Sequence, residues 1–214
     1  MAQKDVYNAF LFEGAKYKGF YEFPEIKATF DIPNKLIKFS KAMLSSTKDY
    51  NQWVHFYEED DKFYRLWRNP ERYLKKLKEF NGVVLPDFSL YRNIPLAKQL
   101  DNILNSRAIG NWLQNNGVKV IPNIRFGDYR TYRCSCDGIA RHCVIAVGSH
   151  GTMKHKRDRE IFISGFEYVI TRLQPTTVIL YGTYPSELLN KYATEGIRVM
   201  LYESEYATNH KEVV

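Results

Sequence analysis

Five short apolar runs, each containing β-branched residues, constrain the fold of this chain more than any other feature of its sequence. The runs are mostly apolar, without regular alternation between apolar and polar residues. Such runs are typical of parallel strands whose two faces are both buried. The runs occupy residues 83–85, 118–124, 144–147, 177–181 and 197–202. We therefore expect these segments to lie parallel in one sheet.

Segments with helical spacing of apolar residues separate most of these runs. Residues 95–116 carry such a pattern and end at Gly117, a common helix stop. Residues 158–173 and 185–194 carry two more. Strands that alternate with crossover helices form a mostly parallel α/β sheet with right-handed connections. The fold class predicted is therefore α/β.

Two further strands are expected upstream, and they leave the architecture open. Residues 35–39 and 53–57 have strand character, and residues 62–80 form the helix after the second of them. With seven strands, an open doubly wound sheet competes with an incomplete or closed TIM-like barrel. The sequence pattern fits either arrangement.

The chain of 214 residues has the composition of an ordinary globular protein, with 44% hydrophobic and 26% charged residues. We expect an irregular N-terminal arm over residues 1–34 and a single α/β domain over residues 35–214. No apolar stretch is long enough to span a membrane, and the N-terminus lacks the features of a signal peptide. The cysteines, Cys134, Cys136 and Cys143, are odd in number and clustered, which predicts reduced thiols in a cytoplasm. The net charge of +7 slightly favours an anionic partner.

Two stretches of the chain resemble an uncharacterised family of bacteriophage and mobile-element proteins from Gram-positive bacteria. They are FNGVVLPDFSLYRNIPLAKQLDNILNSRAIGNWLQNNGVKVIPNIRFGD and VIAVGSHG, and the similarity covers nearly the whole chain. The recurring positions of the family match Pro86, Asp87, Ser89, Pro122, Asn123 and the turn at residues 148–151. The cysteine cluster lies outside this pattern. The resemblance implies a phage or mobile-element setting and no particular reaction.

Polar residues that follow the predicted strands mark the candidate site, because ligands of parallel α/β folds bind beyond the carboxyl ends of the strands. Asp87 is the most informative of them, since it follows a proline at the end of an apolar strand. A half-solvated carboxylate there suits a divalent cation such as Mg²⁺ or the role of a general base, and Asp128 is a second candidate. A turn or helix cap is the alternative role for Asp87. The full set is Glu58, Asp60, Asp87, Ser89, Asn123, Arg125, Asp128, Ser149, His150, Tyr181, Thr183 and Glu203.

The turn at residues 148–151 precedes a predicted helix and a run of basic residues. Free N–H groups at a helix N-terminus suit phosphate, and the two glycines let a ligand approach the backbone. The segment is not a P-loop, which needs Gly-Lys-Ser/Thr at the helix start. A solvated basic turn is the alternative. The predicted anion-binding residues are Gly148, Ser149, Gly151, Lys154, Lys156, Arg157 and Arg125.

His150 lies inside this turn and is a candidate general acid or base, because the pKa of histidine is near neutrality. The chain contains no G-x-S-x-G nucleophile elbow and no H-E-x-x-H motif. A histidine that only bonds a backbone group or a bound anion is the favoured interpretation.

The stretch CSCDGIARHC offers Cys134, Cys136, His142 and Cys143 as zinc ligands if the loop folds back. Zinc fingers usually pair two C-x-x-C knuckles, whereas this stretch has C-x-C and an adjacent His-Cys pair. Cys143 also begins an apolar strand, which is typical of a core residue. We therefore expect no metal here, and zinc is the less favoured alternative.

The sequence leads to one principal functional hypothesis and two alternatives. The principal one is a phage or mobile-element protein of the cytoplasm that binds or processes nucleic acid or a nucleotide at the carboxyl rim of a parallel sheet. One alternative is a non-catalytic phage protein that binds and inhibits a host or defence protein. The other is an enzyme that acts on a small phosphorylated metabolite. Whether the protein is an enzyme stays open.

Overall fold

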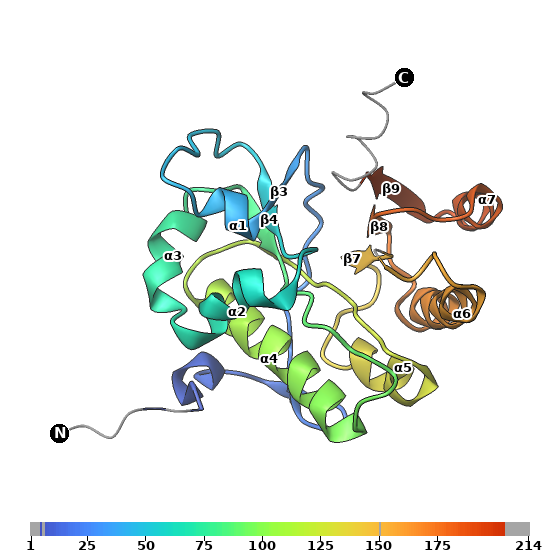
Figure 1. Cartoon of the computed structure of the whole chain (residues 1–214), viewed down its shortest axis with the longest axis horizontal. Helices are drawn as coiled ribbons and strands as arrows, with labels where there is room; N and C mark the ends of the chain where they lie inside the picture. The colour runs from blue at the N-terminus through green and yellow to red at the C-terminus, as the bar shows by residue number, and fades with distance from the viewer. Residues whose placement is uncertain (1–4, 6, 150, 204–214) are drawn as a thin grey trace.

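The structure is a computed structural model, and it describes residue 5, residues 7–149 and residues 151–203. Figure 1 shows the course of the chain. The strands are β1 (Tyr17–Lys18), β2 (Phe23–Pro24), β3 (Leu36–Lys38), β4 (Trp53–His55), β5 (Gly82–Val84), β6 (Val120–Ile121), β7 (Val144–Gly148), β8 (Thr177–Tyr181) and β9 (Arg198–Tyr202). The helices are the 3₁₀ helix η1 (Ala9–Phe12), α1 (Phe39–Ala42), α2 (Asp60–Arg68), α3 (Glu71–Leu77), α4 (Leu96–Asn115), α5 (Tyr129–Cys136), α6 (Lys156–Leu173) and α7 (Ser186–Thr194).

The expected α/β class and the parallel direction of the strands are confirmed. Strands β3-β4-β5-β6 form one parallel sheet and β7-β8-β9 a second. The expectation of one continuous sheet is wrong, because among the described residues the two sheets are joined by a single parallel bridge, Asn123 to Ala146. The N–H of Ala146 donates to the Pro122 carbonyl at 2.8 Å, and that of Ile124 donates to the Ala146 carbonyl at 2.8 Å. Pro122 has no N–H to donate, so the ladder cannot extend on its side.

Both faces of β4 to β8 are buried, which explains their nearly continuous apolar sequences, whereas β3 and β9 are only partly buried. A large apolar cluster packs the strands against the helices, which lie outside them in Figure 1. A second cluster contains no helix residue. Its buried members from the strands are Trp53, Val84, Ile121, Val144, Ala146, Ile179 and Tyr181, and Leu36 and Met200 pack against them. Strands β3 to β9 thus share one inner layer. Among the described residues, β9 and β3 form no ladder.

The long helices agree with the sequence pattern except at two places. The helix expected over residues 62–80 is two helices, α2 and α3, because Pro70 interrupts it and Asn69 leaves the helical region at φ −154°. Helix α6 begins at Lys156, two residues before the expected start at Asp158. Lys156 and Arg157 therefore lie in the first turn of α6 and not in the loop before it.

The N-terminal residues pack on α4. The Asn111 side chain donates to the Leu11 carbonyl at 2.8 Å, and Gln114 accepts from the backbone N–H of Lys27 at 2.9 Å. Strands β1 and β2 form a small antiparallel hairpin within this segment. In the part of the chain that the structure describes, no helix has the length and hydropathy that a membrane span requires.

Candidate functional site

A cavity of about 790 Å³ opens where the carboxyl ends of β3 to β8 meet. Its lining comes from the segments that follow these strands, including Lys38 after β3, Tyr57 after β4 and Asp87 after β5. Gly151 and Tyr181 contribute from the ends of β7 and β8. The volume lies in the range of roughly 300–1,000 Å³ that is typical of small-ligand sites. The cavity therefore lies at the rim where the sequence placed its candidates.

The structure brings together some of the predicted residues and separates others. The predicted residues that line the cavity are Glu58, Asp87, Ser89, Arg125, Gly151 and Tyr181. Those that are described but do not line it are Asp60, Asn123, Asp128, Gly148, Ser149, Lys154, Lys156, Arg157, Thr183 and Glu203. His150 lies outside the described residues.

Asp87 is held by two side chains from the segment after β6, one of which is in turn held by Tyr57 after β4. Asn123 donates its amide N–H to Asp87 Oδ1 at 2.7 Å, and Tyr57 donates its hydroxyl to Asn123 Oδ1 at 3.0 Å. Arg125 Nη1 lies 3.5 Å from Asp87 Oδ2. The Asp87 side chain is only 12% exposed, yet it lines the cavity. These contacts fix one orientation of a carboxylate at the base of the cavity.

Aromatic rings at the ends of β4 and β8 pack against one another and hold Tyr57 of this network in place. The rings of Tyr57 and Tyr181 stack with centroids 4.6 Å apart, and the His55 ring lies 4.7 Å from that of Tyr181. Burial and the nearby Asp87 carboxylate raise the pKa of Tyr57 well above its usual value, so its hydroxyl remains a donor to Asn123. A Cβ on Gly148 would lie 2.6 Å from Tyr57 Cε1. Glycine at this position is what lets the Tyr57 ring pack there.

Charged side chains of both signs surround the mouth of the cavity. Two carboxylates are engaged within the protein: Glu58 accepts from the Ser40 N–H at 2.9 Å, and Asp158 forms an ion pair with Arg92 at 2.7 Å. Asp60 accepts from the N–H of Ser89 at 3.1 Å and thereby fixes the loop after β5. The basic residues of the lining are Lys38, Lys41, Lys62, Arg92 and Arg125.

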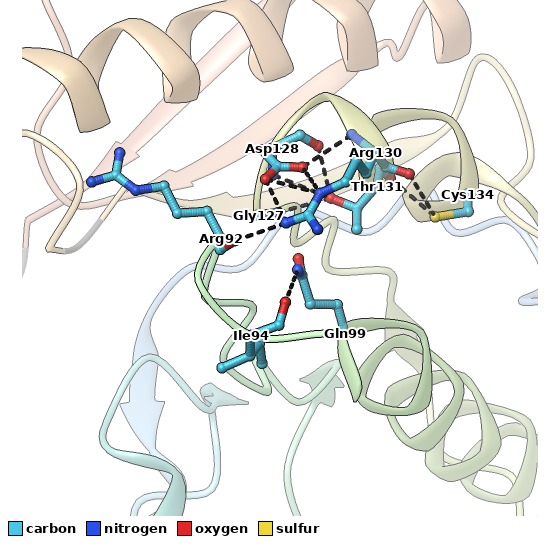
Figure 2. Close-up of polar contacts among 8 residues, drawn as sticks. All are labelled: Arg92, Ile94, Gln99, Gly127, Asp128, Arg130, Thr131 and Cys134. Atoms are coloured by element: carbon cyan, nitrogen blue, oxygen red, sulfur yellow. Dashed lines mark hydrogen bonds and ion pairs between the residues drawn. The ribbon is translucent and has the colours of Figure 1, made fainter. Parts of the chain in front are cut away.

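Asp128 has a structural role that Figure 2 shows. Its Oδ1 accepts from the N–H of Arg130 at 3.1 Å and caps α5, and its Oδ2 lies 2.8 Å from Arg130 Nη2. Arg130 Nη2 also donates to the Arg92 carbonyl at 2.7 Å, which ties the loop of Arg92 to α5. The hydrogen bonds from the Arg130 side chain lower the pKa of Asp128. This carboxylate therefore anchors a cavity loop and does not face the cavity.

Asp128→Ala should lower the free energy of unfolding by about 1–2 kcal/mol at neutral pH, because it removes a helix N-cap. A carboxyl whose pKa is lowered on folding stabilises the protein above its ordinary pKa of 3.8, and this contribution disappears as the pH falls through the lowered value. The difference between wild type and variant in urea unfolding should therefore be smaller at about pH 3 than at about pH 7. Asp101→Ala, an exposed carboxylate paired with Lys98, is the control and should show neither effect. Equal destabilisation at both pH values would contradict this role.

The cysteine cluster consists of three free thiols, all buried. Burial raises the pKa of Cys134 and of Cys143 to about 11 and that of Cys136 to about 12. The raised pKa values keep all three thiols protonated at neutral pH. Within the described residues no group of three or more Cys, His, Asp or Glu side chains is placed to hold a metal ion.

Arg107 of α4 is a contributor that the sequence reasoning missed. It is 2% exposed and donates to the Asn123 carbonyl at 3.2 Å and to the Ser135 carbonyl at 2.7 Å. Ser135 Oγ donates to the Arg125 carbonyl at 2.6 Å. Burial lowers the pKa of Arg107 to about 10. Arg107 and Ser135 thus fix the segment that carries Asn123 and Arg125.

Tyr57 and Arg92 were also missed. Tyr57 is the last residue of the apolar run 53–57, just as Tyr181 is the last residue of the run 177–181. Its position at the end of a predicted strand is therefore the signal that identifies it in the sequence. Arg92 lies in a loop with no pattern of its own, and only the tertiary structure brings it to the cavity.

A comparison with protein families gives one match that covers most of the chain. The family described as Domain of unknown function (DUF4417) matches residues 15–203. The chain belongs to this family. This match and the two phage relatives that follow confirm the predicted relationship to an uncharacterised phage family.

Two phage proteins are similar in sequence to this chain. The Gene 1 protein of Mycobacterium phage L5 is 33% identical over 166 residues, which are 76% of this chain and 71% of the relative. The Gene 1 protein of Mycobacterium phage D29 is 29% identical over 166 residues, 76% of this chain and 60% of the relative. No solved structure matches significantly. These relatives associate the chain with phages.

Proposed function

We propose that the protein binds a nucleotide, free or as a unit of a nucleic acid, in the cavity at the carboxyl rim. The observation that carries this proposal is the Arg125–Asp87 pair at the base of a cavity of about 790 Å³ that also has an aromatic wall. Arginine suits phosphate because its planar guanidinium donates several hydrogen bonds to phosphate oxygens. The Asp87 carboxylate suits a divalent cation bridging to the same phosphate, or a base that activates a nucleophile.

Aromatic side chains support the nucleotide class over a small phosphorylated metabolite. Tyr91 lines the cavity and is 60% exposed, so its ring is accessible to a ligand. Phe126 and Phe162 also contribute to the lining, although both side chains are largely buried in the core. Stacking of a base on an aromatic ring contributes about 1–3 kcal/mol. A metabolite without a ring would gain nothing from this wall.

We also propose that the parallel strands β3 to β9 form an incomplete barrel around the second apolar cluster, the one without helix residues. The bridge between Asn123 and Ala146 links the two sheets on one side. On the other side, the hydroxyl of Tyr202 in β9 donates to the carbonyl of Pro33, just before β3. A barrel explains why loops from β3 to β8 surround one cavity.

Arg125→Met should weaken nucleotide binding by roughly 10–100-fold, because a charge-assisted contact to phosphate contributes about 1.5–3 kcal/mol. The measurement is isothermal titration calorimetry with nucleoside mono- and triphosphates, with and without Mg²⁺, after circular dichroism has shown intact folding. Arg133→Met is the matched control, because Arg133 is exposed on α5 outside the cavity. It should bind as the wild type does.

Asp87→Asn tests the role of the carboxylate with little change in shape. The variant should lose any dependence of binding or turnover on Mg²⁺. The proposal is wrong if the wild type binds no nucleotide or oligonucleotide, or if Arg125→Met binds them with unchanged affinity. A stable complex with a defined host protein that persists in Asp87→Ala, together with no nucleotide binding, would instead support the inhibitor hypothesis.

A further inference from the structure

Exposed basic residues are close in the chain to residues that line one edge of the cavity. Gly151 and Thr152 line the cavity, and Lys154, Lys156 and Arg157 follow them along the chain. All three basic side chains are exposed. None of them lines the cavity.

Internal ion pairs do not account for these charges. Lys156 is 88% exposed and reaches only Glu160, at 4.0 Å. Lys154 and Arg157 form no ion pair within the described residues. Ion pairs at such exposure contribute little to stability, so the run has no evident role in holding α6.

Basic residues also lie at the opposite edge. Lys38 and Lys41 line the cavity from the end of β3 and from α1. Figure 1 shows α1 and α6 on opposite sides of the strands. Basic side chains therefore line the cavity on one side, together with Glu58 and Glu59, and on the other side they follow the lining along the chain.

We infer that the ligand is a single-stranded nucleic acid, with one nucleotide in the cavity and its following phosphates over Lys154, Lys156 and Arg157. This inference rests on the proposed function. A free mononucleotide ends inside the cavity and does not reach exposed cations beyond it, whereas a strand continues past the edge. The exposed ring of Tyr91 in the lining is available for stacking, and a base can stack on it only when it is unpaired, which favours a single strand. The net charge of +7 favours the same class of partner.

The test compares a monomer with a strand of the same base. Affinities are measured for deoxynucleoside monophosphates and for single-stranded homo-oligodeoxynucleotides of about eight nucleotides, over a series of salt concentrations. The variant is the triple substitution Lys154→Gln, Lys156→Gln and Arg157→Gln. The control is the triple substitution Lys75→Gln, Lys78→Gln and Arg133→Gln, which removes the same charge from exposed positions outside the cavity.

Wild-type protein should bind the oligonucleotide more tightly than the monophosphate. The variant should bind the oligonucleotide at least about tenfold more weakly and the monophosphate as the wild type does. Its log–log salt slope should fall by about 0.7 for each phosphate that the variant no longer neutralises. The control triple should change neither value.

Three outcomes would overturn this inference. The first is a variant that binds the oligonucleotide with wild-type affinity and salt slope. The second is a variant that loses monophosphate and oligonucleotide binding equally, since the cations would then belong to the cavity ligand itself. In both cases nucleotide binding, and with it the proposed function, still stands. In the third, wild-type protein binds neither probe, and the proposed function fails as well.

Discussion

Arg107→Ala should lower the free energy of unfolding by about 3–5 kcal/mol. The substitution leaves a cavity beside α4 and removes the donors of the Asn123 and Ser135 carbonyls. Because the Asn123 amide orients Asp87, nucleotide binding should weaken even where the variant is still folded. The measurements are urea unfolding followed by circular dichroism, and calorimetric binding below the unfolding transition.

Two further substitutions separate the causes of this loss. Arg107→Met keeps most of the volume but has no donors, so it should cost less than Arg107→Ala and still expose the effect of the two unpaired carbonyls. Arg133→Ala, at an exposed position on α5, should change stability by less than about 0.5 kcal/mol. A cost below about 1 kcal/mol for Arg107→Ala would show that the segment of Asn123 and Arg125 is held by other contacts.

Gly148→Val should destabilise the protein by about 3 kcal/mol and displace the Tyr57 ring. A Cβ at this position meets Tyr57 Cε1 and Cδ1 at 2.6 and 2.7 Å, well inside van der Waals contact. The ring stacks on Tyr181 and its hydroxyl bonds Asn123, so it cannot move without breaking both contacts. Urea unfolding measures the stability, and calorimetry measures the accompanying loss of nucleotide binding.

A double-mutant cycle with Tyr57→Ala tests the cause. If the clash with the ring is responsible, removing the ring makes room for the valine. The double variant should then be more stable than the sum of the two single effects predicts, by about 1 kcal/mol or more. Additive effects would mean that Gly148→Val acts through its own backbone and not through Tyr57.

The strands were the most predictable part of the fold. Runs such as residues 144–147 and 177–181 are nearly all apolar because both faces of these strands are buried. One face packs in the large apolar cluster against the helices, and the other packs in the second cluster. The break between α2 and α3 is also encoded locally. Pro70 lies within the helix expected over residues 62–80, and a proline inside a helix pattern ends or kinks the helix. The separation into two sheets depends on Pro122, but also on where β7 comes to lie, which no local pattern specifies.

Some residues of the candidate site could likewise be predicted from the sequence, and others could not. Asp87, Arg125 and Tyr181 were predictable because each ends or follows a strand, and the carboxyl ends of parallel strands gather at one rim. Asp128 met the same criterion, yet its carboxylate turns to Arg130 and α5. Sequence position placed it near the rim but gave no information on its orientation.

By itself, the sequence determined the α/β class, the parallel strands and the edge of the strands at which the cavity opens, because these follow from the period of apolar residues over a few positions. Only the tertiary structure decided which side chains face the cavity. The partners of Asp87 and Arg107 come from segments distant in the sequence, such as Asn123 and Ser135. Hydrogen bonds of this kind depend on how separate elements pack, and packing is a property of the whole chain.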